Sequence, residues 1–269
     1  MQVTDFPAEP FELPSMEAMV LADSTGLRLS EGRIDLGGPD ARLSATLPLY
    51  VSLAGASRFE ASEPLIADLD TGDNLDLSTL PALWSQVRSM GGLGRLTLNA
   101  RGSFEDPELT GSITIRNGSF ALEGWAEDLR EVEVDGRFAD ETLVLTRVEG
   151  REGLNGRIGG SGRVLFVDYL PDDIILDLWA DRVLIASVPF LRAIGSSSDL
   201  RLTIERPAEG SPRAPKITGT FTVDKAIYTG EFAAAGAEPD PALMPTAAPD
   251  WLADLRIRAQ DQVRISNQS

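Results

Sequence analysis

Apolar residues recur at every second position along most of this chain, and the pattern is clearest between residues 93 and 120. Successive side chains of a β-strand point to opposite faces, so each such arm presents one apolar face. Between the two arms lies Asp106-Pro107, where proline restricts the backbone and favours a turn. The pattern predicts a β-hairpin whose apolar positions are Leu96, Leu98 and Ala100 before the turn, and Leu109, Ile113 and Ile115 after it.

The second arm of this hairpin recurs downstream. The sequence PELTGSITI, from Pro107 to Ile115, is matched by PKITGTFTV, from Pro215 to Val223. The first arm also recurs, as the LRLTI sequence of residues 200–204, and a longer connection follows it. A repeat of strand, polar turn, proline and strand is typical of a structural module rather than of an active site.

Similar alternation runs from Leu27 to Ile185 and resumes between Trp251 and Ile265, with breakers such as Gly37-Gly38-Pro39 between the segments. Short strands with regular turn signals predict an all-β meander, sandwich, barrel or open sheet. Two segments depart from the pattern. Leu77–Met90 has apolar residues at spacings of three and four, which predicts a short amphipathic helix, and Val188–Ile194 predicts a second helical insert.

The chain divides into four parts. Residues 1–15 are rich in proline and predict an extended lead-in, and residues 16–232 form the repetitive β segment, with repeats near 78–120 and 188–228. Residues 233–250 are rich in alanine and proline and predict a loop or linker. Residues 251–269 begin a further β segment, and we expect the chain to be a piece of a longer protein.

Composition excludes several kinds of function. The 269 residues include 42 acidic and 24 basic side chains, for a net charge of −18, which disfavours nucleic acid as a partner. Histidine and cysteine are absent, so a thiolate nucleophile, a His-dependent triad and a Cys/His zinc site cannot be built. The chain has no apolar run of about 18 residues and no secretory signal pattern at residues 1–16.

Three short motifs resemble chemical sites. Asp70, Asp73 and Asp76 could form a calcium turn, but their spacing is not that of an EF-hand, and a solvated acidic loop is the preferred interpretation. The Gly159–Gly162 segment lacks the Lys-Ser/Thr of a phosphate loop and predicts a tight turn. Asp172 and Asp173 are adjacent, so in a strand their carboxylates diverge to opposite faces. We therefore predict no enzyme activity, no cofactor and no metal site.

The repeated pattern of strands and turns resembles that of the TamB and AsmA-like proteins of diderm bacteria. The residues that carry the resemblance are LTLNARGSFEDPELTGSITIRNGSF (residues 96–120), with its Gly-turn-Pro-x-Leu-x-Gly order, and turns such as GLNGRIGGSG (residues 153–162). The second copy departs from the pattern at Pro207, where a glycine is expected. Asp254 to Asn267 looks like the entry to the family's C-terminal domain. The family's N-terminal membrane anchor is absent from this sequence.

The resemblance implies an elongated, curled, antiparallel-rich sheet (a β-taco or groove) of short repeated strands, with the two helical inserts predicted above. It implies a periplasmic, cell-envelope protein that carries phospholipid between the inner and outer membranes, or supports outer-membrane protein assembly and secretion. The implied partners are phospholipid acyl chains, a TamA-like outer-membrane barrel reached through the missing C-terminal part, and the inner membrane, reached through the missing N-terminal anchor.

The alternation and the resemblance together predict the residues that line such a groove. The alternative is a structural or adhesive all-β repeat whose apolar face is fully packed and binds no ligand. A third class, a hydrolase acting through carboxylates, has little support because nothing in the sequence places two of them together. The predicted lining residues are Leu96, Leu98, Ile113, Ile115, Leu143, Leu145, Leu176, Leu178, Leu202, Ile204, Phe221 and Val223.

Overall fold

The structure is a computed structural model, and it describes most of the repetitive segment. The described residues are 16–23, 26–34, 41–50, 58–59, 64–73, 75–79, 87–103, 107–122, 127–167, 170–188, 191–205, 215–229, 252–259 and 263–265. The predicted lead-in (1–15) and linker (233–250) lie outside these ranges.

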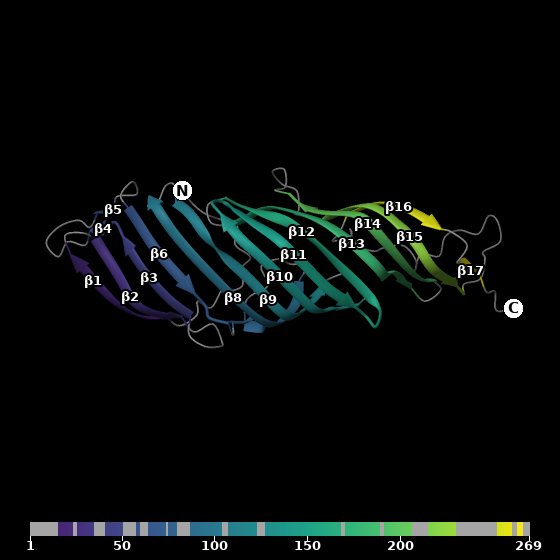
Figure 1. Cartoon of the computed structure of the whole chain (residues 1–269), viewed down its shortest axis with the longest axis horizontal. Helices are drawn as coiled ribbons and strands as arrows, with labels where there is room; N and C mark the ends of the chain where they lie inside the picture. The colour runs from purple at the N-terminus through teal and green to yellow at the C-terminus, as the bar shows by residue number, and fades with distance from the viewer. Residues whose placement is uncertain are drawn as a thin grey trace, which may run out of the picture.

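Nearly all described residues belong to one 15-stranded sheet, in which neighbours along the chain are mostly neighbours in space (Figure 1). The pairs are antiparallel except those of β15 with β16 and with β17, which are parallel. Strands β4 and β5 form a separate two-stranded ribbon. The strands are β1 (Met16–Asp23), β2 (Gly26–Ile34), β3 (Ala41–Leu47), β4 (Leu49–Tyr50), β5 (Arg58–Phe59), β6 (Pro64–Asp70), β7 (Leu75–Asp76), β8 (Val87–Ser103), β9 (Pro107–Leu122), β10 (Leu129–Ala139), β11 (Thr142–Glu152), β12 (Gly156–Val167), β13 (Leu170–Val188), β14 (Leu191–Ile204), β15 (Lys216–Tyr228), β16 (Leu252–Ala259) and β17 (Val263–Ile265).

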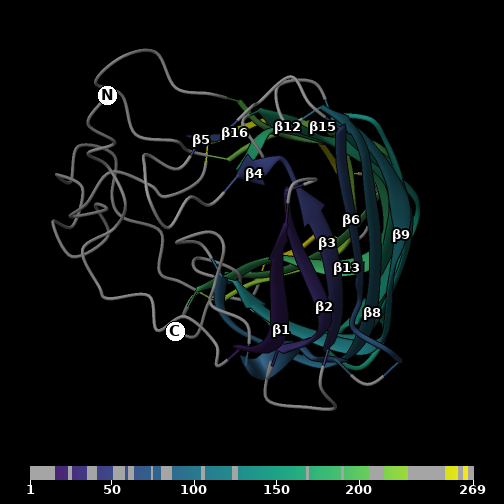
Figure 2. The same ribbon diagram turned by 90° about the vertical axis from the view of Figure 1, so that its left-hand side faces the viewer.

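The sheet is open and curled. Its first and last strands, β1 and β16, lie at opposite ends of the strand order and do not pair, so the sheet does not close into a barrel. Viewed along the stack of strands, it forms an arc that is open on one side (Figure 2). The elongated, curled, antiparallel-rich all-β fold predicted from the sequence is therefore confirmed.

β-Bulges contribute to the curl. Positive φ angles occur at four residues where the strand register shifts: Glu31 (52°), Asn117 (51°), Glu131 (49°) and Arg182 (54°). An extra residue on one strand bends that strand and increases its right-handed twist. Bulges in β2, β9, β10 and β13 therefore bend the sheet along much of its length.

The sequence repeat is also a structural repeat. Both copies of the Pro-x-x-Thr-Gly motif begin the second strand of an antiparallel hairpin, β8–β9 in one case and β14–β15 in the other. Their glycines, Gly111 and Gly219, have φ angles of 155° and 139°. A Cβ at Gly111 would lie 2.1 Å from the Thr97 carbonyl oxygen, and one at Gly219 would lie 2.5 Å from that of Asp199. Glycine lets the two strands of each hairpin approach closely.

Of the two predicted helical inserts, the second is wrong and the first lies largely outside the described residues. The second helical insert does not form, because Val188 ends β13 and Leu191–Ile194 begins β14. Of the first, only the 3-10 helix η1 (Leu77–Thr79) is present among the described residues, and Val87–Met90 belongs to β8. Residues 80–86, which carry most of the apolar positions of the first predicted insert, lie outside the described residues.

The strands are also longer than the short segments that the alternation predicts, reaching 19 residues in β13. Residues 159–162 are part of β12 rather than a tight turn. Glycine is compatible with the strand because a neighbouring side chain occupies the position that a Cβ would take: a Cβ at Gly159 would lie 2.5 Å from the indole ring of Trp179.

Candidate functional site: the apolar face of the curled sheet

Three rows of apolar residues and glycines cross the strands on one face of the sheet. Each row follows residues that are paired in register from strand to strand. Row 1 is Gly32, Leu43, Leu69, Leu98, Gly111, Phe138, Leu143, Val164, Ile174 and Ile204; row 2 is Leu96, Ile113, Gly136, Leu145, Gly162, Leu176, Leu202 and Ile217; row 3 is Gly94, Ile115, Val134, Val148, Gly160, Leu178 and Leu200.

The structure brings all twelve predicted lining residues to this apolar face. Ten of them are members of the three rows. Phe221 and Val223 continue the face on β15, where Phe221 packs with Leu200 and Val223 packs with Ala193 and Ala226. The chain neighbours of Leu98, Ile113, Leu145 and Leu178 lie on the opposite face. These neighbours are Thr97, Thr114, Val144 and Asp177, and they pair there with Ser112, Asp135, Arg163 and Arg201, respectively.

The sequence-based list missed other residues of the face. The same alternation would have found five more members of the rows: Val134, Phe138, Val164, Ile174 and Leu200. Val148 could not be assigned this way, because a register shift between Leu145 and Val148 reverses the alternation. The row glycines carry no apolar signal at all.

Two of the row glycines, Gly136 and Gly162, make room for large side chains of adjacent strands. A Cβ at Gly136 would lie 2.9 Å from both Ile113 Cγ2 and Leu145 Cδ2, and a Cβ at Gly162 would lie 2.6 Å from Leu176 Cδ2. Side chains converge on the inside of a curved sheet, so residues without a Cβ make room for leucine and isoleucine there. We infer from this packing that the apolar face lines the inside of the arc that the strands form in Figure 2.

Row side chains pack mainly on one another. Leu143, Val164, Ile174 and Ile204 form one buried cluster across four strands. Apart from the main sheet, the described elements are the small β4–β5 ribbon and η1; η1 reaches the rows, where Leu77 Cδ2 would lie 3.2 Å from a Cβ at Gly94. The face therefore combines a continuous apolar surface with a one-layer architecture in the described part of the chain.

The opposite face is polar and carries cross-strand ion pairs. Examples that join neighbouring strands are Arg101–Asp68 at 2.6 Å, Arg116–Asp135 at 2.5 Å, Arg157–Asp181 at 2.8 Å and Arg201–Asp177 at 2.7 Å. Exposed pairs of this kind contribute little stability each. Their main consequence is that the two faces of the sheet differ sharply in polarity.

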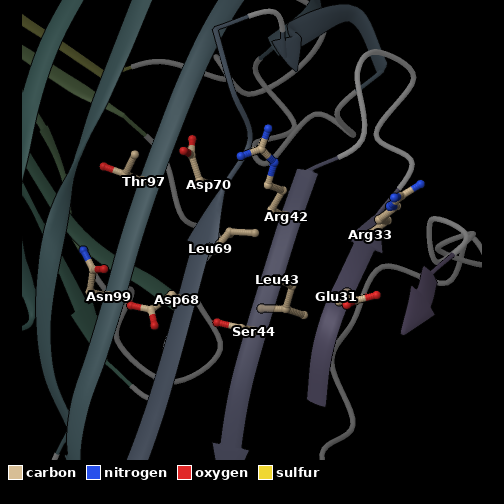
Figure 3. Close-up of a pocket in the computed structure, with 11 residues that line it drawn as sticks. Glu31, Arg33, Arg42, Leu43, Ser44, Asp68, Leu69, Asp70, Thr97 and Asn99 are labelled. Carbon is tan, nitrogen blue, oxygen red and sulfur yellow. The ribbon is translucent and has the colours of Figure 1, made fainter. Parts of the chain in front are cut away.

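A hollow of about 740 Å³ lies on this polar face, between β2, β3, β6 and β8 (Figure 3). Two of its carboxylates are paired with arginines: Asp70 accepts from Arg95 at 3.1 Å and Asp68 from Arg101 at 2.6 Å. Arg95 also donates to Asp73 at 2.9 Å, so its guanidinium occupies the place of the cation in the predicted acidic turn. No group of three or more acidic side chains in the described residues is arranged to hold a metal ion.

One carboxylate is buried at the end of the apolar face. Glu152 is 3% exposed, and its Oε2 accepts a hydrogen bond of 2.6 Å from the Leu184 amide. That amide follows the register shift at Arg182, where the pairing between strands is interrupted. Glu152 thus satisfies a backbone donor beside a bulge, and its arrangement indicates a structural role.

The two repeat hairpins satisfy an equivalent backbone amide in different ways. After Gly111, the Ser112 amide donates to Thr97 Oγ1 at 3.1 Å; after Gly219, the Thr220 amide donates to Asp199 Oδ1 at 3.1 Å. The Thr220 hydrogen bond holds the pKa of Asp199 below its ordinary value of 3.8. A carboxylate with a lowered pKa stabilises the fold above its unfolded pKa, and this stabilisation is lost as the pH falls through the folded pKa.

We therefore expect the second hairpin to be acid-sensitive at Asp199. The Asp199→Asn variant, which keeps an oxygen acceptor but cannot titrate, is expected to lose less thermal stability than the parent protein when the pH is lowered from about 5 to about 2. Melting temperatures of both proteins across this range measure the difference. Parallel pH profiles would show that Asp199 does not contribute.

No family model, curated protein or solved structure matches this chain. The resemblance to TamB and AsmA-like proteins stays a prediction that rests on the repeat residues quoted above. No helix in the described part of the chain is long and apolar enough to cross a membrane.

Proposed function

We propose that this chain is a segment of a cell-envelope, TamB-like protein whose apolar inner face binds phospholipid acyl chains. In this proposal it carries lipid between the inner and outer membranes, supports outer-membrane protein assembly and secretion, or does both. The full-length protein would be held in the inner membrane and would meet a TamA-like barrel at the outer membrane. The observation that carries the proposal is the set of three apolar rows, which no polar side chain interrupts.

The dimensions of the rows suit hydrocarbon. Row 2 passes from β8 to β15 over eight strands, and neighbouring strands lie about 4.8 Å apart, which gives a length of about 34 Å. The hydrocarbon core of a bilayer, two acyl layers, is about 30 Å thick. Acyl chains need no hydrogen-bonding partner, and a polar group placed on this face without one would be costly.

The alternative function is a structural or adhesive repeat whose apolar face is packed and binds nothing. The close contacts at Gly136 and Gly162 favour it, because they show that row side chains already fill part of the space above the sheet. The two functions differ in one property: a lipid-binding face must contact lipid in the cell.

Site-specific photocrosslinking in cells tests this property. A photoreactive residue at Leu98, Ile113, Leu145 or Leu178 is expected to give phospholipid adducts, because these side chains lie on the inner face. The controls are Thr97, Thr114, Val144 and Asp177. Each is adjacent in the chain to one of the four test residues, lies on the same strand and points to the opposite face. Mass spectrometry of the labelled protein identifies the adducts.

Adducts at the first set alone support a one-sided acyl-binding face. Equal labelling of both sets, or labelling of neither, would contradict the proposal and favour the structural repeat.

A further inference from the structure

One tryptophan is exposed on the polar face of the sheet. Trp179 of β13 is 39% exposed, while its chain neighbours Leu178 and Ala180 lie on the apolar face. It is the one aromatic side chain among the exposed large apolar residues in the described part of the chain. A tryptophan can bury up to about 250 Å², so about 100 Å² of this residue meets solvent.

The indole ring of Trp179 rests on a glycine of the neighbouring strand. Trp179 and Gly159 of β12 are paired in register, and a Cβ at Gly159 would lie 2.5 Å from Cζ2, 2.8 Å from Cε2 and 3.1 Å from Nε1 of the indole. Any side chain at Gly159 would therefore displace the ring. An aromatic ring can compensate a strand glycine for its missing side chain. That structural role accounts for the covered side of the ring but not for the exposed side.

Ion pairs surround the exposed ring. Asp177 and Asp181 lie two residues before and after Trp179 on the same face of β13, and Glu149 of β11 lies beyond Gly159, with which it is paired in register. Each of the three carboxylates is held by an arginine. The pairs are Asp177–Arg201 at 2.7 Å, Asp181–Arg157 at 2.8 Å and Glu149–Arg147 at 2.8 Å.

These pairs are charge-compensated and still able to form hydrogen bonds. The Arg157 hydrogen bond holds the pKa of Asp181 below its ordinary value, and the Arg147 hydrogen bond does the same for Glu149. A carboxylate can accept about four hydrogen bonds and a guanidinium can donate five, so one ion pair leaves acceptors and donors for a ligand. Because each acid has a basic partner, a neutral polar ligand suits the site better than a cation.

The spacing along β13 leaves room for a ring-shaped ligand. A strand rises about 3.3 Å per residue, so Asp177 and Asp181 lie about 13 Å apart with the indole between them. The surrounding strands β11, β12 and β14 are all described at this level, and their register fixes the positions of the arginines.

We propose that Trp179 and the ion pairs around it bind a neutral oligosaccharide, with one sugar ring stacked on the exposed side of the indole. The C–H groups on the face of a sugar ring carry a small positive charge and contact the electron-rich face of the indole. Sugar hydroxyls donate to Asp177 and Asp181 and accept from Arg157 and Arg201. The site is on the polar face, so the proposal does not depend on lipid binding at the rows.

NMR titration of the isotope-labelled full chain tests the proposal. The probes are cellotetraose, chitotetraose, maltotetraose and mannotetraose. The chain has four tryptophans, and the indole N–H signal of Trp179 is identified by its absence from the Trp179→Leu variant. At least one tetrasaccharide is expected to shift this signal saturably at millimolar concentrations, while the other indole signals stay in place.

Two variants separate sugar stacking from packing. Trp179→Leu keeps an apolar side chain over Gly159 but has no aromatic face, and the affinity for the tetrasaccharide that binds is expected to fall by about fivefold or more. Val144→Ala is the matched control, because Val144 is also exposed on the polar face, at 41%, but lies outside the ring of ion pairs. Its affinity is expected to equal that of the parent protein.

Three results would overturn the proposal. The first is a Trp179 signal that no tetrasaccharide shifts, and the second is an equal affinity of the parent protein and Trp179→Leu for the sugar. The third is a Trp179 signal that responds to spermidine but to no sugar, which would show a cation-binding site instead.

Discussion

The Gly111→Ala substitution is expected to destabilise the folded protein by about 3 to 5 kcal/mol. Two costs add at this position. The φ angle of 155° lies in a region that residues with a Cβ rarely adopt, and the new methyl group would lie 2.1 Å from the Thr97 carbonyl oxygen. Because that oxygen is backbone, relief requires the two long strands of the hairpin, β8 and β9, to move apart. Urea denaturation measures the loss.

Gly72→Ala is the matched control for this prediction. Gly72 also has a positive φ angle, 68°, but a Cβ there would meet no atom within 4 Å. The substitution therefore carries the backbone strain without the clash and is expected to cost about 1 kcal/mol. Similar losses for the two variants would show that close approach of β8 and β9 is not what the repeat glycine provides.

The Leu202→Asp substitution is expected to disrupt both stability and lipid binding. Leu202 is a half-buried member of row 2, between Leu176 and Ile217. The variant loses apolar burial and places a carboxylate on a face without polar partners, for an expected cost of about 2 to 4 kcal/mol. If the rows bind acyl chains, phospholipid that co-purifies with the protein is expected to fall by about tenfold. Quantitative mass spectrometry of lipid extracts measures this amount.

Thr203→Asp is the neighbouring control. Thr203 is also half-buried, but its side chain is on the polar face, where Thr203 Oγ1 lies 3.5 Å from the Lys216 carbonyl oxygen. A carboxylate there remains hydrated, and we expect a change in stability of less than about 1 kcal/mol with no loss of lipid. Equal lipid content in a folded Leu202→Asp variant would argue against acyl chains on row 2.

Several features of this protein could be predicted from the sequence because they depend on neighbouring residues. The alternation of Leu96, Leu98, Ile113 and Ile115 requires strands with one apolar face, whatever those strands pair with. The repeated Pro-x-x-Thr-Gly motif marks the same position in two hairpins. The same reasoning failed at 159–162, where strand glycines imitate a turn signal, and at 188–194, where the described residues belong to β13 and β14.

The sequence by itself determined the all-β class, the hairpin repeat and the identity of the apolar face, since strand geometry alone places alternate side chains together. Only the tertiary structure decided that the sheet stays open, that Gly136 and Gly162 lie beneath leucine side chains of adjacent strands, and that Arg95 fills the acidic turn at Asp70 and Asp73. These features depend on which strands become neighbours and in what register. Pairing between residues far apart in the chain sets both, and no local pattern records it.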